Sequence, residues 1–199
     1  MFDLLDDLKN KKARSASLEA ILKNHSNFYA GVKSILQESD RLGGIVGAVS
    51  EKLSFDPHYQ TALEIALGVS SQHIIVEDEA AATRAIDFLK KNRAGRATFL
   101  PLTTIKPRQL ADHHRTTIEA SSGFLGLASS LVTYDDSLEM IFQNLLGTTA
   151  IFDTIDHARS AAQKVRYQVR IVTLDGTELR TGGSYAGGAN RQNNSIFIK

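Results

Sequence analysis

The chain has 199 residues, of which 42% are hydrophobic and 23% charged, values typical of a folded globular protein rather than a disordered or fibrous one. Its 23 lysines and arginines balance 22 acidic residues, so any binding of nucleic acid needs a local patch. The lack of cysteine excludes disulfides, thiolate metal sites and a cysteine nucleophile. There is no long apolar run and no basic signal-peptide region at the N-terminus, so we expect a cytoplasmic protein without a membrane partner.

The first predicted element is a helix over residues 1–29, which contain no proline or glycine. Leu4, Leu8, Leu18 and Leu22 fall in a pattern of alternating steps of three and four, the spacing of a coiled coil, although several positions of this seam are polar. Spacing alone leaves two interpretations open: a coiled-coil arm, or an amphipathic helix packed on its own domain. Its place at one end of the chain, before the glycine-rich sequence RLGGIVGAV, favours the arm.

The body of the chain contains the same order of elements twice. Each pass predicts a helix, a strand, a second helix and a second strand. The ranges are 59–68, 71–78, 79–92 and 95–102 in the first pass, and 137–147, 148–154, 155–166 and 167–176 in the second. Leu67-Gly68 and Leu146-Gly147 occupy matching places at the end of the first helix. The echo predicts two related lobes of mixed helix and strand rather than one long sheet.

Two further segments connect and close these lobes. Residues 101–122 hold two of the three prolines and a polar run, so we expect a surface connection there. After the second pass, Asp175-Gly176 predicts a turn into a short strand over residues 177–180, which pairs back as a hairpin. That strand leads into the sequence RTGGSYAGGAN, residues 180–190.

The two glycine pairs in this stretch, Gly182-Gly183 and Gly187-Gly188, resemble a phosphate-binding loop only superficially. No lysine followed by serine or threonine completes a G-x-x-x-x-G-K-[ST] motif, and G-x-G-x-x-G is also missing. Two interpretations remain: a mobile, turn-rich exit loop, or a strip of backbone without side chains that another surface approaches closely.

No constellation of residues indicates catalysis or metal binding. His113 and His114 are neighbours and point in different directions on a helix or strand, and no histidine lies four residues from another. They are interpreted as surface residues. The G-x-S-x-G elbow of a serine hydrolase is also missing.

Basic residues cluster in two places, with Lys90, Lys91 and Arg93 in KKNRAGR and with Lys9, Lys11 and Lys12 in KNKKAR. Cations at the end of a helix usually complement its dipole on a solvated face. The alternative is contact with phosphate groups, which predicts binding that weakens steeply with salt.

Several motifs occur together and in order: LGGIVGAVSEKL, YQTALEIALGVSSQHIIVED, AIDFLKKNRAGRATFLPLTTIKPRQL, NLLGTTAIFD, YQVRIVTLDG and GGSYAGG. Over roughly residues 28–192 this combination resembles the hinge domain of the SMC (structural maintenance of chromosomes) family, in particular its bacterial chromosome-partition members. The resemblance implies an α+β hinge fold of two pseudo-repeated lobes with a flanking coiled-coil helix. It divides the chain into the end of an outgoing arm, lobe I, lobe II and the start of a returning arm, at residues 1–28, 29–110, 111–192 and 193–199.

The resemblance also implies a function, the joining of two subunits into a V-shaped or ring-forming homodimer for chromosome condensation and segregation at the nucleoid. It places the terminal glycines and the tyrosine between them at the hinge–hinge interface, where edge strands of two copies pair: Gly182, Gly183, Tyr185, Gly187 and Gly188. The returning arm would be a further partner. ATPase motifs and kleisin-type partners belong to head domains outside this chain, so we expect neither enzymatic activity nor a cofactor here.

Family hinges are also implicated in DNA binding near the coiled-coil junction, and some bacterial members carry a basic run after the last glycine pair. Here that place reads ANRQNNS, with Arg191 as its one charged residue, so Lys90, Lys91, Arg93 and the arm lysines are the remaining candidates. Two alternative functions stay open at this point. One is a module that mainly binds DNA, and the other is a nucleotide- or metabolite-binding α/β domain that uses the glycine-rich loop.

Overall fold

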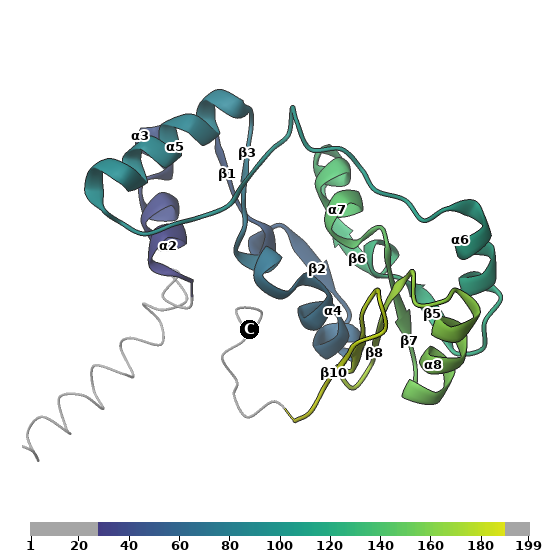
Figure 1. The fold of residues 1–199 in the computed structure, drawn as a ribbon. Helices are drawn as coiled ribbons and strands as arrows, with labels where there is room; N and C mark the ends of the chain where they lie inside the picture. The colour runs from purple at the N-terminus through teal and green to yellow at the C-terminus, as the bar shows by residue number, and fades with distance from the viewer. Residues whose placement is uncertain (1–27, 190–199) are drawn as a thin grey trace, which may run out of the picture.

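A computed structural model of the chain describes residues 28–189, which form two lobes side by side (Figure 1). Lobe I begins with two helices and continues with strands and helices in the order α2 (Ala30–Gln37), α3 (Ser39–Leu42), β1 (Ile45–Ala48), β2 (Leu53–Phe55), α4 (Gln60–Leu67), β3 (Ile74–Val76), α5 (Glu79–Asn92) and β4 (Phe99–Pro101). Lobe II follows as α6 (Asp112–Glu119), β5 (Phe124–Leu127), β6 (Val132–Tyr134), α7 (Glu139–Leu146), β7 (Thr149–Phe152), α8 (Ile155–Lys164), β8 (Arg170–Thr173), β9 (Glu178–Leu179) and β10 (Tyr185–Ala186). Short 3-10 helices lie between them, at Val49–Glu51, Pro57–Tyr59, Gly68–Gln72, Ala128–Ser130 and Asp136–Leu138.

The internal repeat is confirmed, because β1 to β4 of lobe I and β5 to β8 of lobe II follow the same order of strands and helices. Local chemistry explains the matching helix starts. The carboxylate of Asp78 accepts a hydrogen bond from the backbone N–H of Ala81 at 2.8 Å at the start of α5, and the hydroxyl of Thr154 caps α8 in the same way. Gly68 ends α4 with a positive φ of 54°, a conformation that favours glycine.

The strands form separate sheets, as the echo predicts. Lobe I has a three-stranded sheet in the order β1-β3-β4, and lobe II has a five-stranded sheet in the order β10-β9-β8-β7-β5. In each lobe the two central strands are parallel and are connected by a crossover helix, α5 or α8. A third sheet pairs β2 with β6, with Leu53 opposite Tyr134 and Phe55 opposite Val132, so each lobe contributes one strand to the seam between them.

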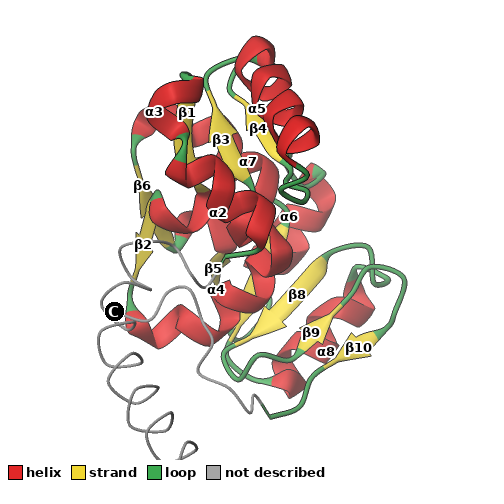
Figure 2. Ribbon diagram, turned by 90° about the vertical axis from the view of Figure 1, so that its left-hand side faces the viewer, coloured by secondary structure: helices red, strands yellow, loops and turns green. Residues whose placement is uncertain are grey.

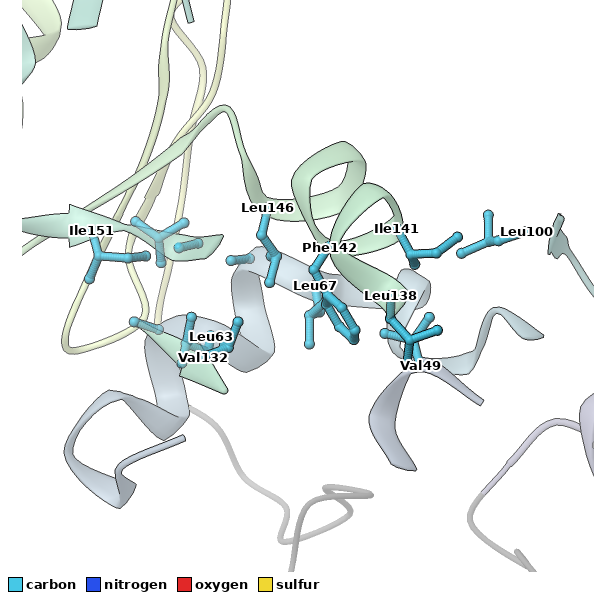
Figure 3. Close-up of a cluster of buried hydrophobic side chains, with 14 of the residues drawn as sticks. Val49, Leu63, Leu67, Leu100, Val132, Leu138, Ile141, Phe142, Leu146 and Ile151 are labelled. Atoms are coloured by element: carbon cyan, nitrogen blue, oxygen red, sulfur yellow. The ribbon is translucent and has the colours of Figure 1, made fainter. Parts of the chain in front are cut away.

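The largest hydrophobic cluster also belongs to both lobes (Figure 3). Leu63 and Leu67 of α4 meet Phe142 and Leu146 of α7 in its centre, and all four side chains are buried. The ring of Phe142 stacks on Tyr134 with centroids 4.6 Å apart. The two lobes therefore share a core, and each also has a smaller cluster under its own crossover helix.

The connection between the lobes differs from the surface loop expected for residues 101–122. It crosses beside α7 and then forms α6, whose Ile118 is fully buried in the cluster of lobe II (Figure 1). The sequence of α6, DHHRTTIE, contains a single large apolar residue, so no helical periodicity shows in it. Burial of Ile118 against lobe II compensates for that weak pattern.

Candidate dimer interface

Strand β10 is the outer edge of the five-stranded sheet. Figure 2 shows β8, β9 and β10 in a row with β10 outermost. A tight turn joins it to β9, because the N–H of Gly183 donates to the carbonyl of Arg180 at 3.0 Å and the N–H of Arg180 donates to Ser184 at 2.8 Å. The hairpin then pairs Tyr185 with Leu179 and Ala186 with Glu178.

The register of this hairpin determines which backbone groups remain available. Opposite residues of an antiparallel pair alternate between hydrogen-bonded and non-bonded positions. Since Arg180 bonds to Ser184, the next pair, Leu179 and Tyr185, is a non-bonded one. The N–H and C=O of Tyr185, and those of Gly187 two residues on, therefore point away from β9. An edge of this kind is a template for another strand.

The glycines leave this edge without side chains. Gly182, Gly183 and Gly188 have φ values of +93°, +102° and +139°, and a Cβ added to any of them would meet nothing within 4 Å. Gly187 differs, since its Cβ would lie 3.3 Å from the hydroxyl of Thr177. A larger residue at the first three positions would fit the space but strain the backbone, so glycine substitutions alter the hairpin as well as its surface.

Tyr185 is 43% exposed and is held from one side by Tyr167. Their hydroxyls are 2.8 Å apart, and this hydrogen bond raises the pKa of Tyr185 above its usual value. The carbonyl of Tyr167 also accepts the N–H of Gly182 at 2.9 Å. Tyr167 thus supports both ends of the hairpin loop, a role that its sequence position, 18 residues before Tyr185, does not indicate.

Behind β10, Glu178 of β9 lies between two arginines. Its carboxylate accepts hydrogen bonds from Arg170 at 2.5 Å and from Arg180 at 3.1 Å. Burial by itself would raise the pKa of Glu178, but the hydrogen bonds and charges of Arg170 and then Arg180 outweigh it, so the pKa is lowered. The carboxylate therefore stays ionised at neutral pH. Beside this group a pocket of about 290 Å³ opens between α4 and the backbone of residues 186–189.

Lobe I presents a second edge. The repeat makes β4 the counterpart of β8, but β9 and β10 have no counterpart in the three-stranded sheet, so β4 ends that sheet. Thr98 and Leu102 bond to β3 through their backbones, which leaves the N–H and C=O of Phe99 directed away from β3. The described residues thus contain one strand edge in each lobe next to the parallel pair.

Comparison with known proteins places this fold and this edge in context. Residues 42–162 match the family model described as SMC proteins Flexible Hinge Domain. This chain belongs to the SMC hinge-domain family.

The hinge is 45% identical over 191 residues to the Chromosome partition protein Smc of Bacillus subtilis (strain 168), an alignment that covers 96% of this chain and 16% of the relative. The chain therefore spans about one sixth of that relative's length. Among solved structures, an asymmetric dimer of the Geobacillus stearothermophilus SMC hinge domain matches with a TM-score of 0.84 and 40% identity, covering 95% of this chain and 76% of that one. The Pyrococcus furiosus Smc hinge domain with an extended coiled coil matches with a TM-score of 0.70 and 29% identity, covering 98% and 67%. The predicted α+β hinge fold is confirmed.

The basic candidates of the hinge fall into two groups. Lys90, Lys91 and Arg93 are exposed at the C-terminal end of α5. The loop that follows them presses on the start of α2, since a Cβ on Gly31 would lie 2.3 Å from the carbonyl oxygen of Arg96. This group therefore lies where the described chain begins. The other candidates, Lys9, Lys11, Lys12 and Arg191, lie outside the described residues, as does the predicted arm helix over residues 1–27.

The other kinds of site have little support in the hinge. The first glycine pair forms a hairpin turn, and up to residue 189 no helix begins behind the glycines, so the geometry does not favour a phosphate loop. Between residues 28 and 189, no three histidine or acidic side chains gather as a metal site would require. No helix in the same range has the length and apolarity needed to cross a membrane.

Proposed function

We propose that this hinge joins two copies of its chain into a homodimer through the edge of β10. The observation that carries the proposal is the free backbone of Tyr185 and Gly187, displayed on a strand that glycines leave open to close approach. Addition of a strand to such an edge supplies main-chain hydrogen bonds between chains. The dimeric hinge of Geobacillus stearothermophilus, 40% identical to this chain, supports the same assembly here.

The partner surface is the β4 edge of the second copy. β4 lacks the two outer strands that its counterpart β8 has, so β10 of one copy continues the lobe I sheet of the other. A twofold axis then produces the same contact twice, which closes the dimer and uses both edges of each copy. This arrangement leaves neither β4 nor β10 exposed to further chains.

In a full-length protein like the Smc relatives, the hinge dimer connects two subunits in a V or ring that acts in chromosome partition at the nucleoid. The hinge itself has no enzymatic role in this proposal and needs no cofactor. ATP hydrolysis and kleisin-type partners belong to regions that this chain, about one sixth of its relative's length, does not include. The returning coiled-coil arm would pair with the predicted helix of residues 1–27.

The decisive experiment compares Tyr185→Pro with Tyr185→Phe by sedimentation velocity. Proline removes the outward N–H of residue 185, which β9 does not use, and it is tolerated on an edge strand. We expect the proline variant to remain folded by circular dichroism and to dimerise at least about tenfold more weakly, because it lacks an inter-chain hydrogen bond and crowds the approaching strand.

The phenylalanine variant keeps the N–H and loses only the hydroxyl contact with Tyr167, so its dimer should be nearly as strong as that of the original chain. A proline variant that is folded and dimerises normally would rule out pairing through β10. Equal weakening in both variants would instead assign the effect to the tyrosine side chain.

A second, accessory function is DNA binding at the end of α5. The supporting observation is the exposed run of Lys90, Lys91 and Arg93 beside the start of α2; between residues 28 and 189 no ion pair involves any of them. Arg93 has a positive φ of 47°, so a fair test leaves it in place. We expect Lys90→Gln with Lys91→Gln to weaken an electrophoretic shift of duplex DNA and to lower its salt dependence by about two phosphate contacts.

Arg159→Gln is the matched control, since Arg159 is an exposed cation of lobe II. If the original hinge gives no shift at low salt, DNA binding by these residues is wrong and dimerisation through β10 is unaffected.

A further inference from the structure

A second concave surface lies in lobe II, outside the β10 edge. A pocket of about 350 Å³ opens between α6 and the C-terminal end of α8. Its lining consists of His113, His114, Thr117, Lys164, Val165, Arg166 and Gln168. Two imidazoles, an ammonium and a guanidinium therefore share one pocket, and no carboxylate is among its lining residues.

These cations lack the counter-charges that their neighbours have. Arg115 on α6 pairs with Glu119 at 2.9 Å, and Arg159 on α8 lies 3.8 Å from Asp156. None of the ion pairs formed within residues 28–189 involves Lys164 or Arg166. Like charges held together without a counter-ion repel one another, and a bound anion removes that repulsion.

The helix dipole explains only part of this cluster. Cations at the last turn of a helix complement its dipole, and α5 of lobe I ends similarly, with Lys90 and Lys91 in its last turn. His113 and His114, however, belong to α6 and reach the pocket from the other side. Their ring centroids are 4.0 Å apart, so protonation of both would place two positive charges together. Dipole compensation at α8 gives no reason for histidines on another helix.

We propose that this pocket binds a phosphate group. The guanidinium of Arg166 and the ammonium of Lys164 supply charge-assisted donors, and the imidazoles add further donors once protonated. Binding strengthens below about pH 6.5, where histidine ordinarily gains its proton. The phosphate can come from the backbone of DNA or from a small phosphorylated molecule, since both present the same anionic oxygens.

Other charged groups near the histidines do not replace this anion. On α6 itself, Asp112 begins the helix without lining the pocket, and Glu119 is engaged by Arg115. Of the elements packed against α6, β5 has the sequence FLGL without a charge, and α8 contributes Lys164 to the pocket. The side chains that face the imidazoles from outside α6 are thus cationic or neutral.

An NMR titration of the isotope-labelled hinge with inorganic phosphate tests the site, at constant ionic strength and with sodium chloride as the reference salt. We expect saturable shifts of the amides of Thr117 and Gln168, with an affinity about threefold or more higher near pH 6 than near pH 8. Lys164→Gln, and the double change His113→Gln with His114→Gln, should each weaken binding about threefold or more.

Lys90→Gln is the matched control, because it removes the equivalent cation at the end of α5 and should leave phosphate binding unchanged. Arg166 is not substituted, since its φ of 54° makes any change there a change of backbone strain. Non-saturable shifts, shifts equal to those with chloride, or equal losses in the control would overturn the proposal.

Fluorescence anisotropy with a labelled duplex of about 20 base pairs distinguishes the two sources of phosphate. If the double histidine variant loses affinity for the duplex as well as for inorganic phosphate, the pocket serves DNA. If only the affinity for inorganic phosphate falls, it serves a small phosphorylated molecule. Both results support the pocket, and both can be obtained whether or not β10 forms the dimer edge.

Discussion

Arg170 connects the two lobes through one side chain. Its guanidinium donates hydrogen bonds to the carbonyls of Ile65 and Ala66 at 2.9 and 2.6 Å, at the end of α4 in lobe I, and to Glu178 in lobe II. The last carbonyls of a helix have no partner within it, so an arginine from a neighbouring strand can satisfy them. The same residue thus closes α4, neutralises Glu178 and supports the hairpin that carries β10.

The first prediction concerns this arginine. Arg170→Met keeps much of the side-chain volume but leaves two helix carbonyls and a buried carboxylate without a donor. We expect the free energy of unfolding to fall by roughly 2–4 kcal/mol in urea denaturation. Arg159→Met is the control, since its ion pair with Asp156 is exposed and should contribute less than about 1 kcal/mol. Similar losses in the two variants would contradict the role of Arg170.

At the scale of single elements, the success of prediction follows the strength of the local signal. The range predicted for α5, residues 79–92, agrees with the structure, because Asp78 caps its start and Arg93 takes a left-handed conformation at its end. The predicted strands appear as shorter ones at the same places, such as β3 and β8. β1 and β5 were not predicted as separate strands, because each is four residues long and contains a glycine.

Helix α6 is the element whose existence depends most on tertiary contacts. Its one buried residue is Ile118, which packs under α8 and β5. We expect Ile118→Ala to lower the free energy of unfolding by about 2–4 kcal/mol, the usual cost of removing a buried aliphatic side chain. Thr116→Ala, a change at an exposed position of the same helix, should have little effect on thermal unfolding. If the two variants unfold alike, α6 contributes little to the core of lobe II.

At the scale of the whole molecule, the seam between the lobes makes them one folded unit. β2 and β6 pair across it, and the shared core lies beneath them. The five-stranded and three-stranded sheets then end at β10 and β4 on their outer sides. A dimer that joins these two ends uses the difference between two otherwise similar lobes.

Cysteine cross-linking distinguishes this dimer from one in which β10 pairs with β10. The chain has no cysteine, so introduced thiols report without background. A hinge with Tyr185→Cys, mixed with a hinge carrying Phe99→Cys or Pro101→Cys, should form a disulfide-linked dimer on a non-reducing gel, because opposite residues of paired strands lie within disulfide reach. Thr83→Cys, on the exposed side of α5, serves as the control partner. Efficient cross-linking of the Tyr185→Cys chain with itself would contradict the β4 partner.

The sequence by itself determined the repeat, the order of helices and strands, the β8–β9 hairpin and the resemblance to the SMC hinge, because caps, glycine stops and apolar periodicity act over a few residues. It also singled out the glycines, but not which backbone groups of Tyr185 and Gly187 point outward, since that depends on the register with β9. Only the tertiary structure brought Arg170 to α4, Tyr167 to Tyr185, and His113 and His114 to Lys164 and Arg166. These contacts join residues from separate elements, and no local pattern encodes the packing that brings them together.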